Sequence, residues 1–156
     1  MTTKRSVRVG WIACGLVAAM GTGALETSAQ SQSLEDIAWL EGRWVGSGGG
    51  FDAFYESFTL DGSALRQREH PDSTFRTAGS LSEWRLSEGR IVKYSEGEAV
   101  SEITAIVGDS LRIERLNSDR PGYSWVRRGP DEWVAILERQ GDDPVRYVMR
   151  RLDSGA

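Results

Sequence analysis

The chain has 156 residues, 27% of them charged, and a formal net charge of −4 at pH 7. Its acidic balance and its scattered arginines give no electrostatic case for binding nucleic acid. One cysteine, Cys14, and one histidine, His70, exclude a disulfide framework and make the usual cysteine and histidine metal sites poor.

Residues 1–29 are expected to be a signal peptide. Lys4, Arg5 and Arg8 form a positive start, and an apolar segment follows them at about residues 9–25. Thr27-Ser28-Ala29 then offers small residues for signal peptidase. The alternative is a membrane anchor, but the apolar segment is diluted by Gly, Thr and Ser and falls short of the ~20 apolar residues of a span. We therefore expect a periplasmic or secreted protein.

Cleavage after Ala29 would leave residues 30–156 as one domain without a cysteine. The formal net charge would change from −4 to −6, because three basic residues and one acidic residue leave with the signal. Cys14 raises a lipoprotein alternative, but Trp11-Ile12-Ala13 lacks the usual leucine before such a cysteine. No stable membrane insertion is expected after cleavage.

Residues 33–42 predict one short helix of about two turns. Ser33 is a suitable N-cap, Asp36 follows three residues later, and Gly42 suits the C′ position. A helix of this length is not stable alone, so it must dock its apolar side on the rest of the domain. Its expected docking groups are Trp39, Leu40 and Trp44.

From Arg43 onward, short strands alternate with turns rich in Gly, Asp, Ser and Pro. The expected strands are 43–47, 51–60, 64–70, 74–86, 90–95, 99–107, 110–117, 123–128, 132–139 and 145–152. Short hairpin connections favour a sheet that curls and closes, because closure removes exposed edges. The sequence therefore predicts an all-β fold, an antiparallel up-and-down β-barrel of about 8–10 strands with one short N-terminal helix.

The alternation of residue types sorts the faces of these strands. In the strand at 51–60, Phe54, Phe58 and Leu60 share one side, and Glu56 lies on that side with them. Leu111 with Ile113, Tyr123 with Trp125, and Trp133 with Ala135 and Leu137 give further apolar sides. A barrel of this size can enclose a small ligand or be filled by its own side chains. The sequence leaves both open.

The segment Trp39-Leu40-Glu41-Gly42-Arg43-Trp44, followed by Gly46 and Gly48-Gly49-Gly50, resembles the opening of calycin-like barrels. It is similar to the fatty-acid-binding-protein-like and nitrobindin-like branch, and especially to an exported bacterial family of unknown function. The resemblance implies a barrel that holds a small molecule in its interior. It says little about chemistry.

The nitrobindin resemblance also suggests haem, which requires a histidine on a strand late in the chain. The histidine here, His70, comes early and precedes Pro71 at the expected end of a strand. We therefore expect no haem, no other cofactor and no metal. Chemistry of the Ser-His-Asp type would have to use His70, and no serine lies in a Gly-x-Ser-x-Gly elbow. No catalytic residue is predicted, and an enzyme is the less favoured class.

Glu56 is the most interesting candidate residue, because an inward carboxylate must find a partner or raise its pKa. Arg66 and Arg68 could supply the countercharge, with Arg115 and Arg127 as more distant options. The alternatives are a structural ion pair or a Glu56 that faces solvent, since the inward face of 64–70 is ambiguous. The expected ligand-binding residues are Phe54, Glu56, Phe58, Arg66, Arg68, Trp84, Trp125, Trp133 and Tyr147.

Three function classes follow. The first is an exported barrel that binds a small apolar or amphipathic molecule. The second is a filled barrel that acts as a protein-interaction or envelope accessory module, with an unknown protein partner. The third is an enzyme that uses Glu56 on a lipid-like substrate and needs Glu56 to be reachable with a raised pKa.

Overall fold

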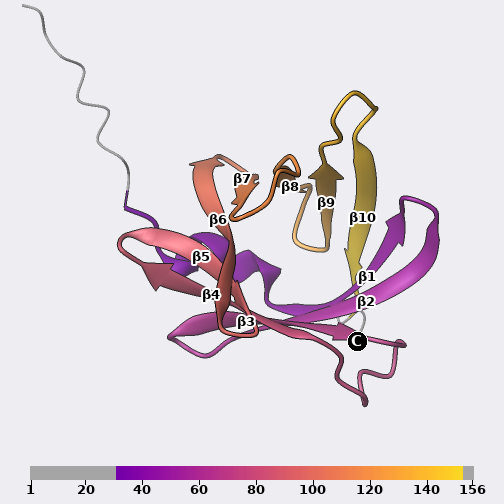
Figure 1. The fold of residues 1–156 in the computed structure, drawn as a ribbon. Coiled ribbons are helices and arrows are strands. Elements are labelled where there is room, and N and C mark those ends of the chain that lie inside the picture. The colour runs from indigo at the N-terminus through magenta and orange to yellow at the C-terminus, as the bar shows by residue number, and fades with distance from the viewer. Residues whose placement is uncertain (1–30, 153–156) are drawn as a thin grey trace, which may run out of the picture.

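The computed structural model describes residues 31–152, which form a closed barrel of ten antiparallel strands preceded by one short helix (Figure 1). The predicted all-β fold is confirmed. The expected signal peptide at residues 1–29 and Cys14 lie outside the described residues. The elements are η1 (Leu34–Leu40), β1 (Gly42–Gly48), β2 (Phe51–Leu60), β3 (Ala64–His70), β4 (Leu81–Ser87), β5 (Arg90–Ser95), β6 (Glu98–Val107), β7 (Ser110–Arg115), β8 (Tyr123–Arg127), β9 (Glu132–Leu137) and β10 (Val145–Arg151).

Each strand pairs with the next one along the chain, and β1 pairs with β10 to close the ring. In this closing pair Trp44 lies opposite Arg151 and Gly46 lies opposite Met149. The pairing of β1 with β2 shifts register between Gly46 and Gly48, which helps the sheet to bend there. The glycine-rich start of the barrel therefore serves curvature.

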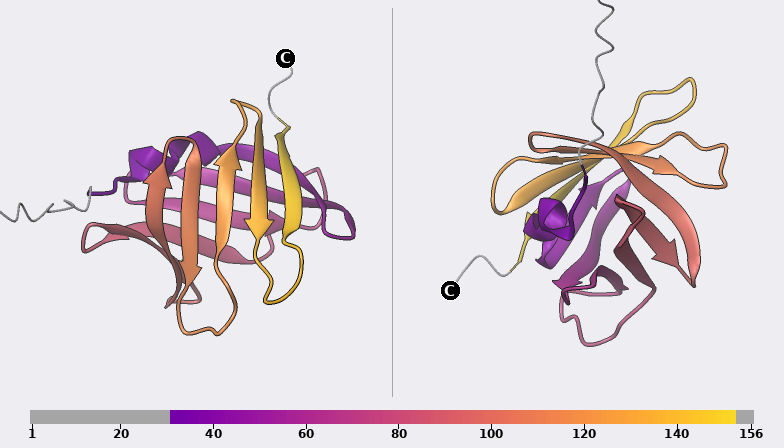
Figure 2. Two further views of the ribbon diagram at one scale, coloured as in Figure 1. Left: turned by 90° about the horizontal axis from the view of Figure 1, so that it is seen from above. Right: turned by 90° about the vertical axis from the view of Figure 1, so that its left-hand side faces the viewer.

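Helix η1 is a 3₁₀ helix that packs against β3 and β4 at one end of the barrel (Figure 2). Asp36 accepts a hydrogen bond from the Ser33 backbone N–H at 2.8 Å, which marks the helix start. The indole Nε1 of Trp44 donates to the carbonyl of Leu40 at 2.7 Å, and Ile37 and Leu40 are fully buried. The helix thus docks through Leu40 and Trp44, as predicted. Within residues 31–152, no helix has the length and apolar character to cross a membrane.

The two ends of the barrel differ. The helix covers the end where β1 begins and β2 ends, and Gln32 ties it to β5 and β6 by bonds to Ile91 N–H and Ile103 C=O. The opposite end carries the β1–β2 hairpin and the three long loops at 71–80, 116–122 and 138–144. Among residues 31–152, a plug is therefore present at the helix end alone.

The half of the barrel nearest the helix is filled by a continuous apolar core. Its fully buried members include Trp44, Leu65, Trp84, Ile91, Ile103, Leu111 and Ile113. Aromatic rings extend this core toward the middle of the barrel, where Trp84 lies 5.3 Å from Trp125 and Phe58 lies 6.1 Å from Trp125, centroid to centroid. These edge-on pairs are the arrangement that aromatic quadrupoles favour.

The predicted strand at 74–86 is wrong in its first half, because β4 begins at Leu81. The carboxylate of Asp72 accepts bonds from the backbone and hydroxyl of Thr74, and Phe75 adopts a positive φ of 55°. Both features fold the chain back on itself and are incompatible with an extended strand. Residues 71–80 are therefore a loop at the open end.

Candidate ligand pocket

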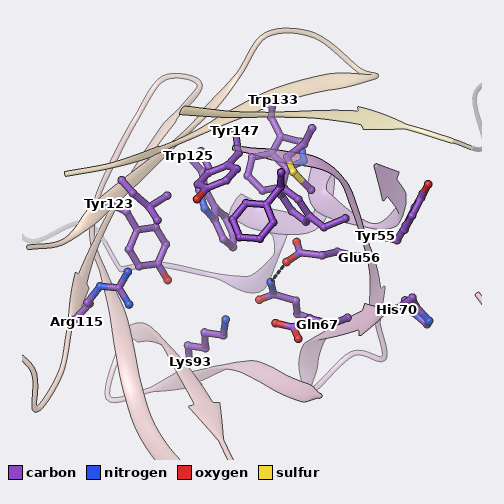
Figure 3. A pocket seen from close by; sticks show the side chains of 16 residues that line it. Tyr55, Glu56, Gln67, His70, Lys93, Arg115, Tyr123, Trp125, Trp133 and Tyr147 are labelled. Carbon is purple, nitrogen blue, oxygen red and sulfur yellow. Dashed lines mark hydrogen bonds between the residues drawn. The ribbon is translucent and has the colours of Figure 1, made fainter. Parts of the chain in front are cut away.

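The half of the barrel away from the helix contains a pocket of about 640 Å³ (Figure 3). Pockets that hold small molecules typically measure about 300–1,000 Å³. The lining consists of Phe51, Phe54, Tyr55, Glu56, Gln67, Glu69, His70, Lys93, Arg115, Tyr123, Trp125, Trp133, Ala135, Leu137, Tyr147 and Met149. These residues come from β2, β3, β5, β7, β8, β9 and β10, so the pocket lies inside the ring of strands.

One wall of the pocket is aromatic. Trp125 and Trp133 lie 4.9 Å apart between their ring centroids and separate the pocket from the filled core. Phe54 meets Tyr147 edge-on at 5.5 Å, and both come from strands near the closing pair. Gly46 makes this contact possible, because a Cβ there would collide with the Phe54 ring and lie 2.6 Å from Met149 Sδ. The wall offers a large apolar surface to a ligand.

The facing wall carries polar and charged side chains, with Glu56 and Gln67 at its centre (Figure 3). Gln67 donates from Nε2 to Glu56 Oε1 at 3.2 Å and accepts from Trp84 Nε1 at 3.3 Å. Gln67 is one of only two buried polar side chains among residues 31–152, the other being Ser101. Its amide therefore links the pocket to the core.

Burial raises the pKa of Glu56 to about 7, from an ordinary value of 4.5. The positive charge of Lys93 and the hydrogen bond from Gln67 oppose the rise, while the negative charge of Glu69 adds to it. The side chain is surrounded by protein but keeps some surface on the pocket. Near neutral pH it is therefore a mixture of acid and carboxylate that a ligand can reach.

Lys93 and Arg115 are the cations of this wall. Burial lowers the pKa of Lys93, and Arg115 lowers it further, while Glu56 and Glu69 act in the opposite direction. Arg115 lies over the ring of Tyr123 at 5.1 Å and donates from Nε to the carbonyl of Pro121 at 3.2 Å. The carbonyl and the ring fix the guanidinium at the edge of the pocket.

Tyr123 adds a phenol to the same wall. It is 7% exposed and shares a hydrogen bond with the buried Ser101. Burial raises the pKa of its hydroxyl, so the phenol stays protonated around neutral pH. It can donate or accept a hydrogen bond there.

A second hollow of about 640 Å³ lies beside the first, between the loops at 116–122 and 138–144. The two share Arg115, Leu137 and Tyr147. The second is more polar, with Arg120, Arg139, Asp119, Glu138 and Asp142 among its lining residues. It forms an outer chamber next to the aromatic pocket.

Five of the nine predicted ligand-binding residues line the inner pocket. They are Phe54, Glu56, Trp125, Trp133 and Tyr147. Phe58 and Trp84 lie deeper, in the filled core, with exposed fractions of 2% and 0%. Phe54, Glu56 and Phe58 therefore share the inward side of β2, and Phe58 packs in the core beneath the pocket.

Arg66 and Arg68 do not reach the pocket. Arg66 pairs with Asp61 at 2.6 Å and with Glu83 at 3.1 Å, and about half of its side chain is exposed. After the buried Ala64 that begins β3, Leu65 and Gln67 are buried while Arg66 is exposed and Arg68 half-buried, so the two arginines occupy the outer side. The cation next to Glu56 is instead Lys93.

Three residues that matter here were not among those predicted: Gln67, Lys93 and Tyr123. From the sequence, Arg115 is expected only as a more distant countercharge for Glu56. The alternation Leu111, Ile113, Arg115 points directly to an inward Arg115. Lys93 gives a weaker signal, because its strand is apolar at both Ile91 and Val92, so either face could be inward.

His70 lies at the rim, away from the labelled cluster of Glu56, Gln67 and Lys93 (Figure 3). Within residues 31–152 no three His, Cys, Asp or Glu side chains are grouped so that they could hold a metal ion.

The sequence matches no family model and no curated protein. The closed ten-strand barrel, open and hollow at one end, is consistent with a calycin-like barrel.

Proposed function

We propose that this protein binds a small amphipathic molecule in the open half of its barrel. The observation that carries the proposal is the pocket itself, in which aromatic side chains face Glu56, Lys93 and Arg115. Apolar walls with a few placed polar groups are typical of small-molecule sites. The aromatic wall would hold the apolar part of the ligand, and the charged wall would hold its polar end.

The resemblance of residues 39–50 to fatty-acid-binding-protein-like and nitrobindin-like barrels supports the same proposal. We also propose that binding takes place in the periplasm or outside the cell, on the basis of the signal peptide expected at residues 1–29. A barrel filled throughout, with a protein partner instead of a ligand, is disfavoured because the interior is solid only in the half covered by the helix.

A titration with 8-anilinonaphthalene-1-sulfonate, whose aromatic rings carry a sulfonate, tests the proposal. We expect saturable binding with energy transfer from Trp125 and Trp133. β9 offers a matched pair of variants, since Leu137 lines the pocket while the neighbouring, equally half-buried Ile136 does not. Leu137→Asp should weaken binding at least tenfold, and Ile136→Asp should not.

Native mass spectrometry of the protein purified from its own compartment then addresses the natural ligand. A reproducible extra mass that is lost on denaturation supports the proposal. If the dye does not bind the folded wild-type protein, or if both β9 variants bind it equally, ligand binding in this pocket is wrong.

A second candidate function is proton transfer on the bound molecule, and the pKa of about 7 for Glu56 favours it. General bases work best when their pKa is near the operating pH. The test uses 5-nitrobenzisoxazole, from which a base removes the ring C–H proton as the N–O bond opens. Glu56→Gln should abolish any acceleration over buffer, whereas Glu98→Gln at an exposed site should keep it.

A further inference from the structure

On the outer side of β2 and β3, at the rim of the ligand pocket, a serine and a histidine form a hydrogen-bonded pair; His70 lines that rim and Ser57 does not line the pocket. Ser57 Oγ on β2 lies 2.8 Å from His70 Nε2 on β3, and Thr77 O lies 2.9 Å from His70 Nδ1. A carbonyl oxygen only accepts, so Nδ1 carries a proton and donates it to Thr77. In the neutral imidazole, Nε2 is then the acceptor, and the Ser57 hydroxyl donates to it.

We propose that Ser57 is a nucleophile activated by His70, and that this pair attacks small esters at the outer surface of the barrel. The geometry is the one that a serine nucleophile needs: a base at hydrogen-bond distance, itself oriented by a third group. Here a backbone carbonyl is the orienting group. The activity is distinct from ligand binding inside the barrel, because the nucleophile Ser57 does not line the pocket, although Tyr55 and His70 lie at its rim.

The loop at 71–80 holds the histidine in place. Phe75, at its positive φ of 55°, puts its ring 4.7 Å from the His70 ring and 6.1 Å from the Tyr55 ring, centroid to centroid. Thr77 belongs to the same loop. The fold of this loop therefore sets both the rotation of the imidazole and its tautomer, and the two aromatic rings give an apolar edge for an acyl group.

Two arginines flank the serine. Arg43 on β1 and Arg68 on β3 are the direct cross-strand neighbours of Ser57 in the ladder. Directly opposite residues have Cβ atoms about 4.5–5.5 Å apart and project on the same face. Arg68 is half-buried on the same face as Ser57, so it is the candidate to stabilise the negative charge that would develop on an attacked carbonyl oxygen.

The proposed ester hydrolysis needs water as its only other reactant. Ser57 Oγ forms a bond to the ester carbonyl carbon as its proton passes to His70 Nε2. The bond to the alkoxide then breaks, and the imidazolium returns the proton to the departing alcohol. Water, deprotonated by His70, hydrolyses the acyl-serine, releases the carboxylic acid and restores the hydroxyl.

A fluorophosphonate probe tests the proposal, because the serine oxygen displaces fluoride from phosphorus and retains the label. Peptide mapping of the labelled wild-type protein should place the phosphonyl group on Ser57. Ser124 is the matched control, since it also lies half-buried on the outer side of a strand but has no histidine bonded to it. His70→Gln should slow labelling on the order of 100-fold, the scale of general-base assistance.

A purely structural bond between Ser57 and His70 would stabilise the loop without making the serine reactive. If Ser57 reacts no faster than Ser124, or as slowly in the native protein as in urea, the proposal is wrong. This comparison of labelling rates uses the wild-type protein alone, so it tests the proposal even if His70→Gln fails to fold. Hydrolysis of p-nitrophenyl acetate that Ser57→Ala abolishes, with the dye titration unchanged, would extend the labelling result to turnover.

Discussion

Gln67 donates its amide hydrogen to Glu56 across 3.2 Å, and its orientation is fixed from behind by the core. Because an indole N–H only donates, Trp84 Nε1 must face the amide oxygen of Gln67, which leaves the NH₂ group for Glu56. The carboxyl group of the pocket is thus held by a donor that the buried core of the barrel keeps in place.

Gln67→Leu should raise the pKa of Glu56 above 7. The substitution removes a hydrogen bond that lowers this pKa and leaves the effect of burial less opposed. It also leaves the buried indole of Trp84 without its acceptor, which costs about 1–3 kcal/mol of stability. Carbon-13 NMR of the Glu56 carboxyl group measures the titration midpoint directly. An unchanged midpoint in a folded variant would show that the Gln67 bond has no effect on the charge of Glu56.

Glu56→Gln should flatten the dependence of stability on pH. The pKa of Glu56 is raised in the folded state, so between pH 4.5 and about 7 the folded protein binds more protons than the unfolded chain. Wild-type stability should therefore fall as pH rises through this window. Above about pH 7 the free energy of unfolding of the wild-type protein should be about 3 kcal/mol lower than below pH 4.5, as far as Glu56 is concerned.

The measurement is urea unfolding of wild type and variant at several pH values from 4 to 8. Glu98→Gln is the control, because its side chain is exposed. The free energies of unfolding of the two glutamine variants should differ most above pH 7, because only Glu56→Gln removes a buried negative charge there. Parallel pH profiles for wild type and Glu56→Gln would mean that Glu56 is ionised normally in the native protein.

Trp44→Phe should loosen the helix from the barrel. The change removes the donor of the 2.7 Å bond to Leu40 C=O at a fully buried position. Loss of this bond together with a reduction in packed volume should cost about 1–3 kcal/mol in the free energy of unfolding. Trp39→Phe is the control, since that indole is only half-buried. Equal effects at the two positions in urea unfolding would contradict a special role for the Trp44 bond.

Gly46→Ala should narrow the ligand pocket. The added Cβ would occupy the space of the Phe54 ring and Met149 Sδ, so these side chains must move. Overpacking of this kind costs about 1–3 kcal/mol. Dye titration and urea unfolding measure both effects, and Gly129→Ala, where nothing lies within 4 Å, is the control. Unchanged dye affinity in Gly46→Ala would show that the Phe54 side of the pocket is not used.

The strands could be predicted from the sequence because turn residues punctuate them and their hydrophobic alternation is clear. The inward face of β2 follows from Phe54, Phe58 and Leu60, and with it the interior position of Glu56. The alternation does not predict which face of β3 points into the barrel, because charged and polar residues occupy both faces. The burial of Leu65 and Gln67 in the folded barrel identifies the inward face. Arg66 and Arg68 were expected beside Glu56 for this reason.

The prediction of a strand that begins at residue 74 is wrong for a different physical reason. Asp72 and Thr74 form a local hydrogen-bonded turn, and this side-chain chemistry outweighs the β propensity of the residues that follow. The depth of each aromatic residue could not be predicted either. Phe58 and Phe54 share a face, but only the docking of the helix at one end makes the first a core residue and the second a pocket residue.

The closing pair of β1 and β10 also has a kinetic consequence. Trp44 and Arg151 lie at opposite ends of the barrel sequence, and the guanidinium lies 4.3 Å from the centroid of the indole ring. Contacts between such distant parts of a chain form slowly, because the loop-closure entropy must be paid first. Before β10 is in place, the edges of β1 and β9 are unpaired and can bind other polypeptide chains. We therefore expect aggregation to compete with folding in the interval before the final strand pairs with β1.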